Sequence, residues 1–179
     1  MNFRSYRLDE EDAIQSLFVS VFTNSESESE GQLIGKLVRN LIQDNAEKEV
    51  HGFVAEEQLG VILGTVLFSR ISVSGTQGVF LLSPVAVHSD HQGRGIGQHL
   101  IQYGMNQLKN EGVRFVVTYG DPGFYSKVGF RPISHEVFIP PYELTYPEGW
   151  LGLSLTYDLI HSLKGRCSCL SAFNDPAYW

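Results

Sequence analysis

The chain has 179 residues, of which 42% are hydrophobic and 18% are charged, a balance typical of a globular protein with a sizeable core. Its net charge of −7 disfavours nucleic acid or an anionic membrane as the main partner, because phosphate-rich surfaces require clustered Lys and Arg. The same charge permits a cationic substrate such as an amine. No apolar run approaches the roughly 20 residues of a membrane span, and residues 1–4 contain no signal-peptide core, so we expect a cytoplasmic protein without membrane contact.

The first quarter of the chain predicts one strand followed by two amphipathic helices. Residues 3–8 alternate as a short strand, and Asp9 is a good N-cap for the helix that follows. A Ser- and Glu-rich loop at residues 23–29 separates this helix from the next one. Apolar residues recur at helical spacing in both helices, at Ile14, Leu17, Phe18, Val21 and Phe22 and then at Leu33, Ile34, Leu37, Val38, Leu41 and Ile42.

The next segment predicts a β-hairpin and then a long strand. Residues 52–56 and 61–68 are typical of strands, and the tight turn at residues 57–60 joins them. A second turn, at residues 75–78, leads into an apolar strand at residues 79–87.

Three glycines at alternate positions, Gly93, Gly95 and Gly97, open the amphipathic helix that follows this strand. A Gly inside a helical turn costs about 1 kcal/mol relative to Ala, so three at a helix mouth require an explanation beyond folding. Anion binding is such an explanation, because the first amides of a helix have no internal partner and that end is partly positive. Glycines let an anion approach these amides, and Arg94 adds a charge. A phosphate or pyrophosphate fits this pattern, and an ordinary glycine-rich turn is the structural alternative.

Two other glycine motifs do not match. A dinucleotide-binding fingerprint would require Gly at the position of Gln98, and a P-loop would require Gly-Lys-Ser/Thr, which does not follow here. The pattern that remains is Gln92-x-x-Gly95-x-Gly97, directly behind the strand at residues 79–87.

The second half of the chain predicts further strands around a short glycine-rich segment. Residues 113–118 form a buried strand, and a strand–helix–strand order implies a right-handed crossover with parallel pairing. Residues 120–130 follow it, and a new strand begins at Phe130. An aromatic, acidic and proline-rich loop spans residues 140–148, and residues 149–155 are expected to form the last strand.

Two of these segments resemble motifs of the GNAT superfamily of acyl-CoA-dependent N-acetyltransferases. The Gln92-x-x-Gly95-x-Gly97 pattern resembles the pyrophosphate-binding motif of that family, Gln/Arg-x-x-Gly-x-Gly/Ala. Residues 120–130 resemble the family segment that carries a Tyr on a short helix, followed by Gly-Phe at the start of the next strand. The resemblance covers roughly residues 3–156.

The resemblance implies an α/β fold of the mixed α+β type. It predicts a twisted mixed sheet of about six to seven strands flanked by helices and splayed at the central parallel strands. Pro84 suits the splay, because it removes one donor from the ladder; an edge or a bulge is the alternative. We expect a single N-acetyltransferase domain at residues 1–160 and a C-terminal tail of uncertain role at residues 161–179.

The resemblance also implies an activity: transfer of an acetyl group from acetyl-CoA, the co-substrate, to a primary amine by direct attack in a ternary complex. Tyr125 is then the catalytic candidate at the leaving thiolate. A monomer or a homodimer is expected. The alternative is a non-catalytic acyl-CoA-binding sensor or partner-docking module, and a more distant one is a phosphate-binding structural domain. The residues implied for acetyl-CoA binding are Val85, Ala86, Val87, Gln92, Gly93, Arg94, Gly95, Ile96, Gly97, Phe124, Tyr125 and Lys127.

Elementary acid–base chemistry narrows the role of Tyr125. An unperturbed Tyr has a pKa of about 10 and a thiol a pKa of about 8.5, so complete proton transfer to the thiolate would be uphill by roughly 2 kcal/mol. A hydrogen bond from Tyr125 to the thiolate, with solvent supplying the proton, costs less free energy. The alternative is that Tyr125 is only a packed aromatic side chain. The general base is not assigned, because a water relay to solvent could remove the proton of the amine without a dedicated base. The side chains that qualify by type are His88, His91, His135, Asp121, Glu143 and Glu148.

Acidic side chains suggest where an amine would bind. Glu143 and Glu148 lie in the aromatic loop at residues 140–148, which could line a substrate mouth or merely connect two strands. Glu26, Glu28 and Glu30 could also attract a positive substrate, or form a solvated acidic loop. No metal site is expected, because Cys167 and Cys169 have no adjacent His and are interpreted as reduced free thiols.

Overall fold

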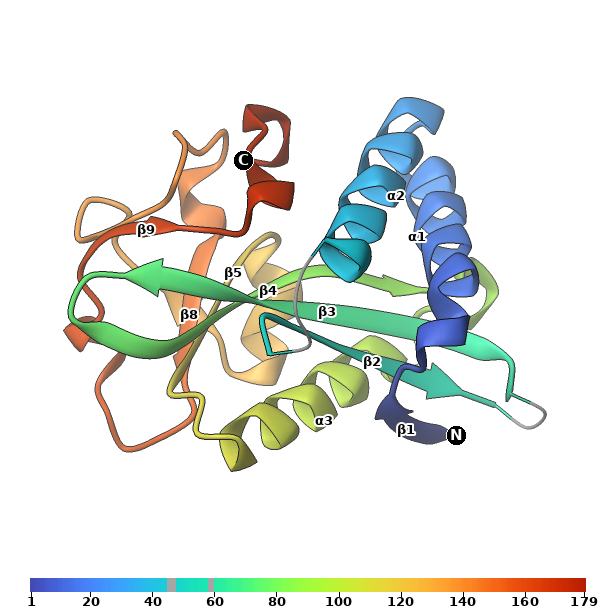
Figure 1. The fold of residues 1–179 in the computed structure, drawn as a ribbon, viewed down its shortest axis with the longest axis horizontal. Coiled ribbons are helices and arrows are strands. Elements are labelled where there is room, and N and C mark those ends of the chain that lie inside the picture. Colours follow the sequence, from blue (N-terminus) through green and yellow to red (C-terminus); the bar gives the residue numbers. More distant parts are fainter. Residues whose placement is uncertain (45–47, 58–59) are drawn as a thin grey trace. The chain divides into compact units, whose positions relative to one another are not determined.

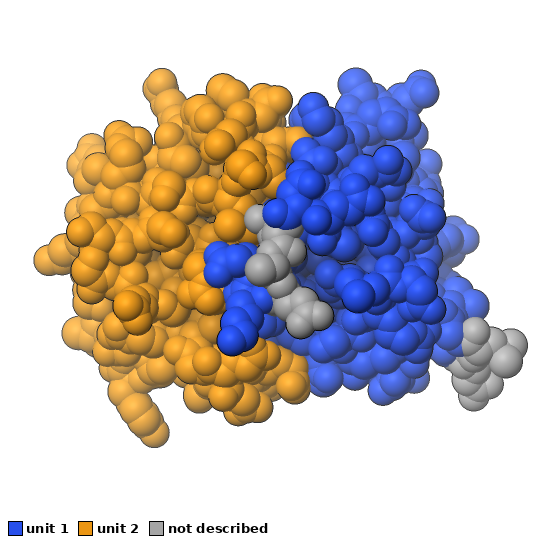
Figure 2. Space-filling view, in the orientation of Figure 1, with its two compact units in different colours: residues 1–68, 84–104 blue, residues 69–83, 105–179 orange. Residues whose placement is uncertain are grey.

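The structure, a computed structural model of the chain, describes residues 1–44, 48–57 and 60–179. It comprises two compact units, coloured separately in Figure 2. Unit 1 contains residues 1–68 and 84–104, and unit 2 contains residues 69–83 and 105–179. Two strands and one helix run from one unit into the other, namely β3 (Ile62–Val73), β4 (Thr76–Val87) and α3 (Ile96–Asn110). The division into a domain at residues 1–160 and a tail at residues 161–179 stays a prediction.

Unit 1 combines strands with helices on both sides (Figure 1). The strand β1 pairs antiparallel with β2, from Asn2 opposite Glu56 to Ser5 opposite Phe53. The helices α1 and α2 lie side by side on one side of the strands, and α3 lies on the other (Figure 1). A Cβ at Gly104 of α3 would lie 2.6 Å from the Phe68 ring, so this glycine permits close packing of helix on strand. The remaining elements of this unit are β1 (Asn2–Ser5), α1 (Glu11–Ser25), α2 (Glu28–Gln43) and β2 (Val50–Glu56).

Both predicted N-terminal helices are confirmed, but the predicted N-cap is wrong. A 3-10 turn at Leu8–Glu10 precedes α1, and Asp9 is exposed on it. Glu10 occupies the N-cap position of α1 without a side-chain cap hydrogen bond, and its buried carboxylate instead accepts the Arg7 backbone N–H at 2.8 Å and the Arg4 Nη1 at 2.8 Å. The Glu10 carboxylate pairs with both Arg4 and Arg7, whereas Asp9 is exposed. Rules that consider only the residue types at a helix start do not include such ion pairs.

The predicted loop at residues 23–29 is largely helical. The helix α1 continues to Ser25, and α2 already begins at Glu28. Ser27 is the N-cap of α2, and its hydroxyl accepts the Glu30 backbone N–H at 3.2 Å. The Ser- and Glu-rich composition of this segment therefore reflects a cap and an exposed first helical turn.

Unit 2 contains the parallel pair that the strand–helix–strand pattern predicted. The strand β4 pairs parallel with β5, from Val79 opposite Phe115 to Leu82 opposite Thr118. The recorded pairing ends two residues before Pro84, the residue that we associated with a splay. The strand β8 pairs antiparallel with β5 and with β6. The elements of this part of the chain are β5 (Phe115–Tyr119), α4 (Pro122–Tyr125), β6 (Arg131–Pro132), β7 (Phe138–Ile139), β8 (Trp150–Ser154) and β9 (Gly165–Ser168).

The expected mixed α/β fold is confirmed, and its sheet contains more strands than the six to seven expected. The described residues form nine strands, with β1-β2-β3-β4-β5-β8-β6 as the main order. The segment at residues 149–155 is not the last strand, because β9 follows it and pairs with β3 and with β7. Three of the four residues of β9 are exposed, so it carries little hydrophobic pattern.

The predicted hairpins are present, with different limits. The Glu57 N–H donates to the Val61 carbonyl at 2.9 Å, as a hairpin between β2 and β3 requires. Gln58 and Leu59, which belong to the predicted turn, lie outside the described residues. The strand β3 continues past residue 68 to Val73, and β4 begins at Thr76, so the predicted turn at residues 75–78 is too long. Gly78 has a φ of +70° inside β4, which explains why this segment is typical of a turn.

Among the described residues, no helix combines the length and the apolar character that crossing a bilayer requires.

Candidate functional site

The glycine turn of unit 1 joins the end of β4 to the start of α3. A short 3-10 turn at Ser89–His91 follows β4, and α3 begins at Ile96. Gly93 and Gly95 have φ values of +73° and +78°, which other residues adopt only with strain. A Cβ at Gly93 would meet no atom within 4 Å, so the space beside this backbone is open. Backbone conformation, and not crowding, therefore requires glycine here.

Two side chains of the motif fasten the turn to itself. The Gln92 Nε2 donates to the Val87 carbonyl at 3.0 Å, and the Arg94 Nη2 donates to the Asp90 carbonyl at 3.1 Å. Gln92 thereby ties the turn to the end of β4. Arg94 is exposed, and its guanidinium has further N–H donors besides the one that binds the Asp90 carbonyl.

The first turn of α3 has backbone amides without partners in the helix. The His99 backbone N–H donates to the Gly95 carbonyl at 3.0 Å, which is the first bond of the helical ladder. The amides before His99 therefore have no acceptor within the helix, and the helix dipole makes this end partly positive. These amides, the two glycines and Arg94 together can bind a phosphate or pyrophosphate group.

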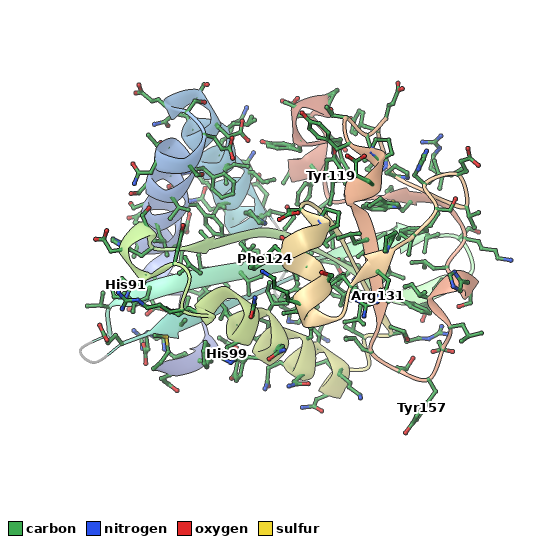
Figure 3. The ribbon with its side chains drawn as sticks, turned by 180° about the vertical axis from the view of Figure 1, so that it is seen from behind. His91, His99, Tyr119, Phe124, Arg131 and Tyr157 are labelled. Carbon is green, nitrogen blue, oxygen red and sulfur yellow. The ribbon has the colours of Figure 1, made fainter. Side chains whose placement is uncertain are left out.

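Two histidines, His88 and His91, precede the glycines of the turn, and a third, His99, follows them in α3. The His88 and His91 rings lie edge to face at 5.6 Å, and the His88 Nδ1 accepts the Asp90 backbone N–H at 3.3 Å. Figure 3 labels His91 on this turn and His99 on α3. The His88 side chain thus caps the 3-10 turn at Ser89–His91.

Tyr125 lies in unit 2, at the end of the short helix α4. The Asp121 carboxylate caps this helix and accepts the Gly123 backbone N–H at 2.8 Å. The Tyr125 ring packs edge to face on Phe124 and on Phe130, at 5.0 and 5.7 Å between centroids. The predicted arrangement of a Tyr on a short helix before a new strand is therefore present.

One glycine makes room for the Tyr125 ring. A Cβ at Gly120 would lie 2.7 Å from the Tyr125 Cε2, a separation that carbon atoms do not tolerate. The ring is buried, with 8% of the residue exposed. Gly120 and the two Phe rings therefore hold Tyr125 in one orientation.

The environment of Tyr125 keeps its hydroxyl neutral. Burial raises the pKa of Tyr125 to about 12, a side-chain hydrogen bond with Thr118 opposes the shift, and the charge of Asp121 adds to it. The Thr118 hydroxyl itself donates to the Leu82 carbonyl at 2.9 Å. The Tyr125 hydroxyl therefore stays protonated at neutral pH and is a poor source of a free proton.

The neighbours of Tyr125 differ in exposure. Phe124, labelled in Figure 3, is half-buried on α4, and Lys127 is exposed on the 3-10 turn that follows. Gly129 ends that turn with a φ of +101°, and Phe130 is buried immediately before β6. The contact of Lys127 with acetyl-CoA stays a prediction.

A pocket of about 370 Å³ lies within unit 2, beyond the end of β5. Glu148 lines it, as does Asp121, whereas Glu143 is exposed and is not among the residues described as lining it. Tyr119 was not predicted as a site residue, although it lies at the carboxyl end of a strand in a parallel pair, where binding residues often lie. The lining residues are Tyr119, Gly120, Asp121, Pro122, Tyr146, Glu148 and Gly149.

The remaining acidic and basic candidates are dispersed. Glu26 and Glu28 are exposed at the connection between α1 and α2, and Glu30 is half-buried in the first turn of α2. His135 is exposed between β6 and β7. None of these four residues is among those described as lining the pocket.

The two cysteines are free thiols, as expected. Cys167 is buried in β9, and Cys169 is partly buried. The neighbouring Cys167 thiol and burial raise the pKa of Cys169, so that the thiol stays protonated. Within the residues that the structure describes, no group of three or more His, Cys, Asp or Glu side chains is placed to hold a metal ion.

Known proteins are similar to this chain in sequence and in fold. A family model described as "Acetyltransferase (GNAT) domain" matches residues 48–132. The crystal structure of the GNAT family N-acetyltransferase YhbS from Escherichia coli, in complex with CoA, has a TM-score of 0.83 with this chain at 26% identity, over 97% of this chain and 92% of that one. The chain belongs to the GNAT superfamily.

Two further comparisons agree with this assignment. A GNAT family acetyltransferase from Brucella melitensis, solved in complex with acetyl-CoA, has a TM-score of 0.76 at 28% identity, over 97% of each chain. By sequence, the E. coli protein YhbS, an uncharacterized N-acetyltransferase, is 35% identical over 85 residues. That alignment covers 47% of this chain and 51% of YhbS, so it spans about half the length of this curated relative.

Proposed function

We propose that this GNAT member is an acetyl-CoA-dependent N-acetyltransferase, which moves the acetyl group of acetyl-CoA to a primary amine by direct attack in a ternary complex. The observation that carries the proposal is the glycine turn, in which Gly93 and Gly95 hold positive φ values at the start of α3. Such a turn suits the pyrophosphate of CoA. The CoA and acetyl-CoA complexes of the two related crystal structures support this choice of anion.

In the proposed complex, each part of acetyl-CoA has a place along the chain. The pyrophosphate binds the turn from Gln92 to Gly97, where Gly93 leaves open space and Arg94 supplies a charge. The pantetheine arm and the acetyl carbonyl bind the backbone of Val85–Val87, the last residues of β4. A backbone N–H aimed at the carbonyl oxygen would stabilise the oxyanion that forms there. Phe124 and Lys127 complete the proposed binding residues.

The reaction forms a C–N bond and breaks a C–S bond. The cationic amine first loses one proton, either to a side chain or through a water relay to solvent, which frees its lone pair. The neutral amine then attacks the acetyl carbon, the tetrahedral intermediate collapses, and CoA leaves as a thiolate. The amine nitrogen then loses its extra proton, either to a side chain or through a water relay to solvent. The thiolate finally takes a proton from solvent.

Tyr125 is proposed as the hydrogen-bond donor to the departing thiolate. With a pKa of about 12 for Tyr125 and about 8.5 for a thiol, complete proton transfer would be uphill by about 5 kcal/mol. A hydrogen bond to sulfur needs no such transfer and is stronger in the transition state, where charge builds on sulfur. The raised pKa therefore favours the donor role over the acid role.

The acceptor in this proposal is an amine that is cationic in its resting form, with Glu143 and Glu148 as candidate carboxylates for it. The overall charge of −7 favours such a substrate. Glu148 has the stronger claim, because it lines the pocket of unit 2. The cytoplasmic location and the monomeric or homodimeric state stay predictions.

Thiol release during acetyl transfer tests the proposal and separates an enzyme from an acyl-CoA sensor. The chain should release free CoA thiol when acetyl-CoA is offered with a matching amine from a panel of primary amines. A chain that binds acetyl-CoA but releases no thiol with any amine would be the sensor. A chain whose melting temperature is unchanged at millimolar acetyl-CoA would contradict both.

The Tyr125→Phe variant tests the role of the hydroxyl. It keeps the ring, so the melting temperature and the acetyl-CoA affinity should change little. Loss of one donor to a developing charge typically costs about 3 kcal/mol, so kcat should fall about a hundredfold. The matched control is Tyr157→Phe, because Tyr157 is exposed and projects away from the ribbon (Figure 3). An unchanged kcat in Tyr125→Phe, with chemistry rate-limiting, would leave Tyr125 a purely structural role.

A further inference from the structure

One lining residue of the unit 2 pocket stacks on an aromatic side chain far along the chain. The Tyr119 ring, which lines the pocket, stacks on the Trp179 ring with 6.3 Å between centroids and 16° between planes. Figure 3 labels Tyr119 at the end of β5. Stacked aromatic pairs of this kind contribute beyond their buried area and fix the relative orientation of the rings.

Trp179 is itself held in place. It is 5% exposed, its indole N–H donates to the Phe173 carbonyl at 3.2 Å, and its ring meets the buried Trp150 edge to face at 6.2 Å. Its carbonyl accepts a hydrogen bond from the Thr145 hydroxyl at 2.8 Å. Trp179 therefore has one orientation, set by the neighbouring segment and by the core of unit 2.

Trp179 is also linked by a hydrogen bond to the segment that contains Tyr146, another lining residue. Thr145, which donates to Trp179, directly precedes Tyr146, a lining residue. The Tyr146 backbone N–H donates to the Tyr119 hydroxyl at 2.7 Å. The ring stack and these two hydrogen bonds therefore join Trp179, Thr145, Tyr146 and Tyr119 in a closed set of contacts, two members of which line the pocket.

The lining of the pocket indicates what it can bind. Two of the lining residues, Asp121 and Glu148, are acidic, and two others, Tyr119 and Tyr146, are aromatic. The residues described as lining it include no Lys, Arg or His. Carboxylates and the faces of aromatic rings both attract cations, and an apolar group beside the cation can pack against the rings.

We propose that this pocket binds the ammonium group of the acceptor amine and that Trp179 is a positioning residue, which fixes Tyr119 and the backbone at residues 145–146 for that binding. The inference rests on the proposed function, because it gives the pocket to the acceptor. It deepens that function by selecting an amine with a cationic head and an apolar or aromatic body.

Binding of a cation that cannot be acetylated tests the pocket without requiring turnover. The probe is benzyltrimethylammonium, whose nitrogen carries neither a proton nor a lone pair, titrated by calorimetry into the full chain. The parent chain should bind it, and Glu148→Gln should weaken binding about tenfold through loss of one carboxylate. Glu136→Gln is the matched control, because it makes the same change at an exposed Glu that is not among the lining residues. No saturable binding by the parent chain, or equal effects of the two substitutions, would overturn the pocket assignment.

Substitutions at Trp179 test the positioning role. Trp179→Ala should weaken binding of the probe about tenfold, whereas Trp179→Phe, which retains an aromatic ring to stack on Tyr119, should restore most of it. Thr145→Val removes only the hydrogen bond to Trp179 and should weaken binding severalfold even if Trp179→Ala fails to fold. Binding by a folded Trp179→Ala or by Thr145→Val that equals the parent value would overturn the positioning role.

Turnover supplies an independent readout. With the best amine of the panel, Trp179→Ala should raise the acceptor KM about tenfold and leave the KM for acetyl-CoA nearly unchanged. Equal changes in both KM values would indicate a general structural defect and contradict the inference. If the parent chain binds the cation but transfers no acetyl group, the proposed function fails, whereas the binding results still decide on the pocket and on Trp179.

Discussion

A single methyl group at Gly120 should disable Tyr125 without touching its hydroxyl. The Cβ of Gly120→Ala would lie 2.7 Å from the Tyr125 Cε2, and ordinary contact begins at 3.4 Å, so the ring must move by about 0.7 Å. Phe124 and Phe130 pack on the same ring and leave it little freedom. The displacement therefore reaches the hydroxyl at the far end of the ring.

The expected magnitudes follow from this displacement. Overpacking in a tight site costs about 1–3 kcal/mol, which for a chain of this length lowers the melting temperature by several degrees. A catalytic group misplaced by about 1 Å can lose about a hundredfold in rate, so kcat should fall between tenfold and a hundredfold. The assay is thiol release at saturating acetyl-CoA and amine, together with thermal unfolding followed by circular dichroism.

Two comparisons make the reasoning refutable. Gly123→Ala adds the same methyl in the same segment, where it would meet only the Asp121 carboxylate at 3.1 Å, and it should change kcat little. The double variant Gly120→Ala/Tyr125→Phe should be no slower than Tyr125→Phe, because both changes remove the same interaction. A multiplicative loss in the double variant, or a normal kcat in Gly120→Ala, would show that Gly120 does not act through Tyr125.

Two further predictions concern unit 1. Gly95→Glu places bulk and negative charge at the anion site and should abolish most of the thermal stabilisation by acetyl-CoA, which is about 2.7 kcal/mol at 100 times its Kd. The control is Gly75→Glu, which should keep this stabilisation. Gly75 also has a positive φ, and a Cβ there would meet no atom within 4 Å. An equal loss in both variants would place the ligand elsewhere. The hydrogen bond from Arg4 holds the pKa of Glu10 below its ordinary value of 4.5, so the stabilisation from Glu10 should be complete above pH 4.5 and lost as the pH falls through the lowered pKa. In urea unfolding, the stability difference between the parent and Glu10→Gln should therefore shrink below pH 4.5, and a difference that is constant down to pH 2 would refute this.

Local patterns in the sequence were sufficient for several parts of the fold. The spacing of apolar residues predicted α1 and α2, because an amphipathic helix repeats its buried face every few residues along the chain. The glycine motif predicted the turn before α3, because positive φ is a property of single residues and glycine adopts it without strain. The short helix that carries Tyr125 was predicted through the family resemblance.

Features that depend on contacts between distant residues were not predictable in this way. The choice of Glu10 over Asp9 at the start of α1 depends on Arg4, and the strand β9 depends on pairing with β3, about 95 residues earlier by sequence number. Neither contact leaves a periodic signal in the segment concerned.

The pocket of unit 2 is the clearest case of such dependence. Its wall requires Tyr119 and Trp179 to stack, although the residues between them form four strands and several turns. Each residue viewed alone is one more aromatic side chain, because a stacking partner is chosen by the packing of the whole unit and not by its neighbours in sequence. Sequence patterns therefore sufficed for the turn that would hold a phosphate, and only the folded chain brought together the residues proposed to bind the amine.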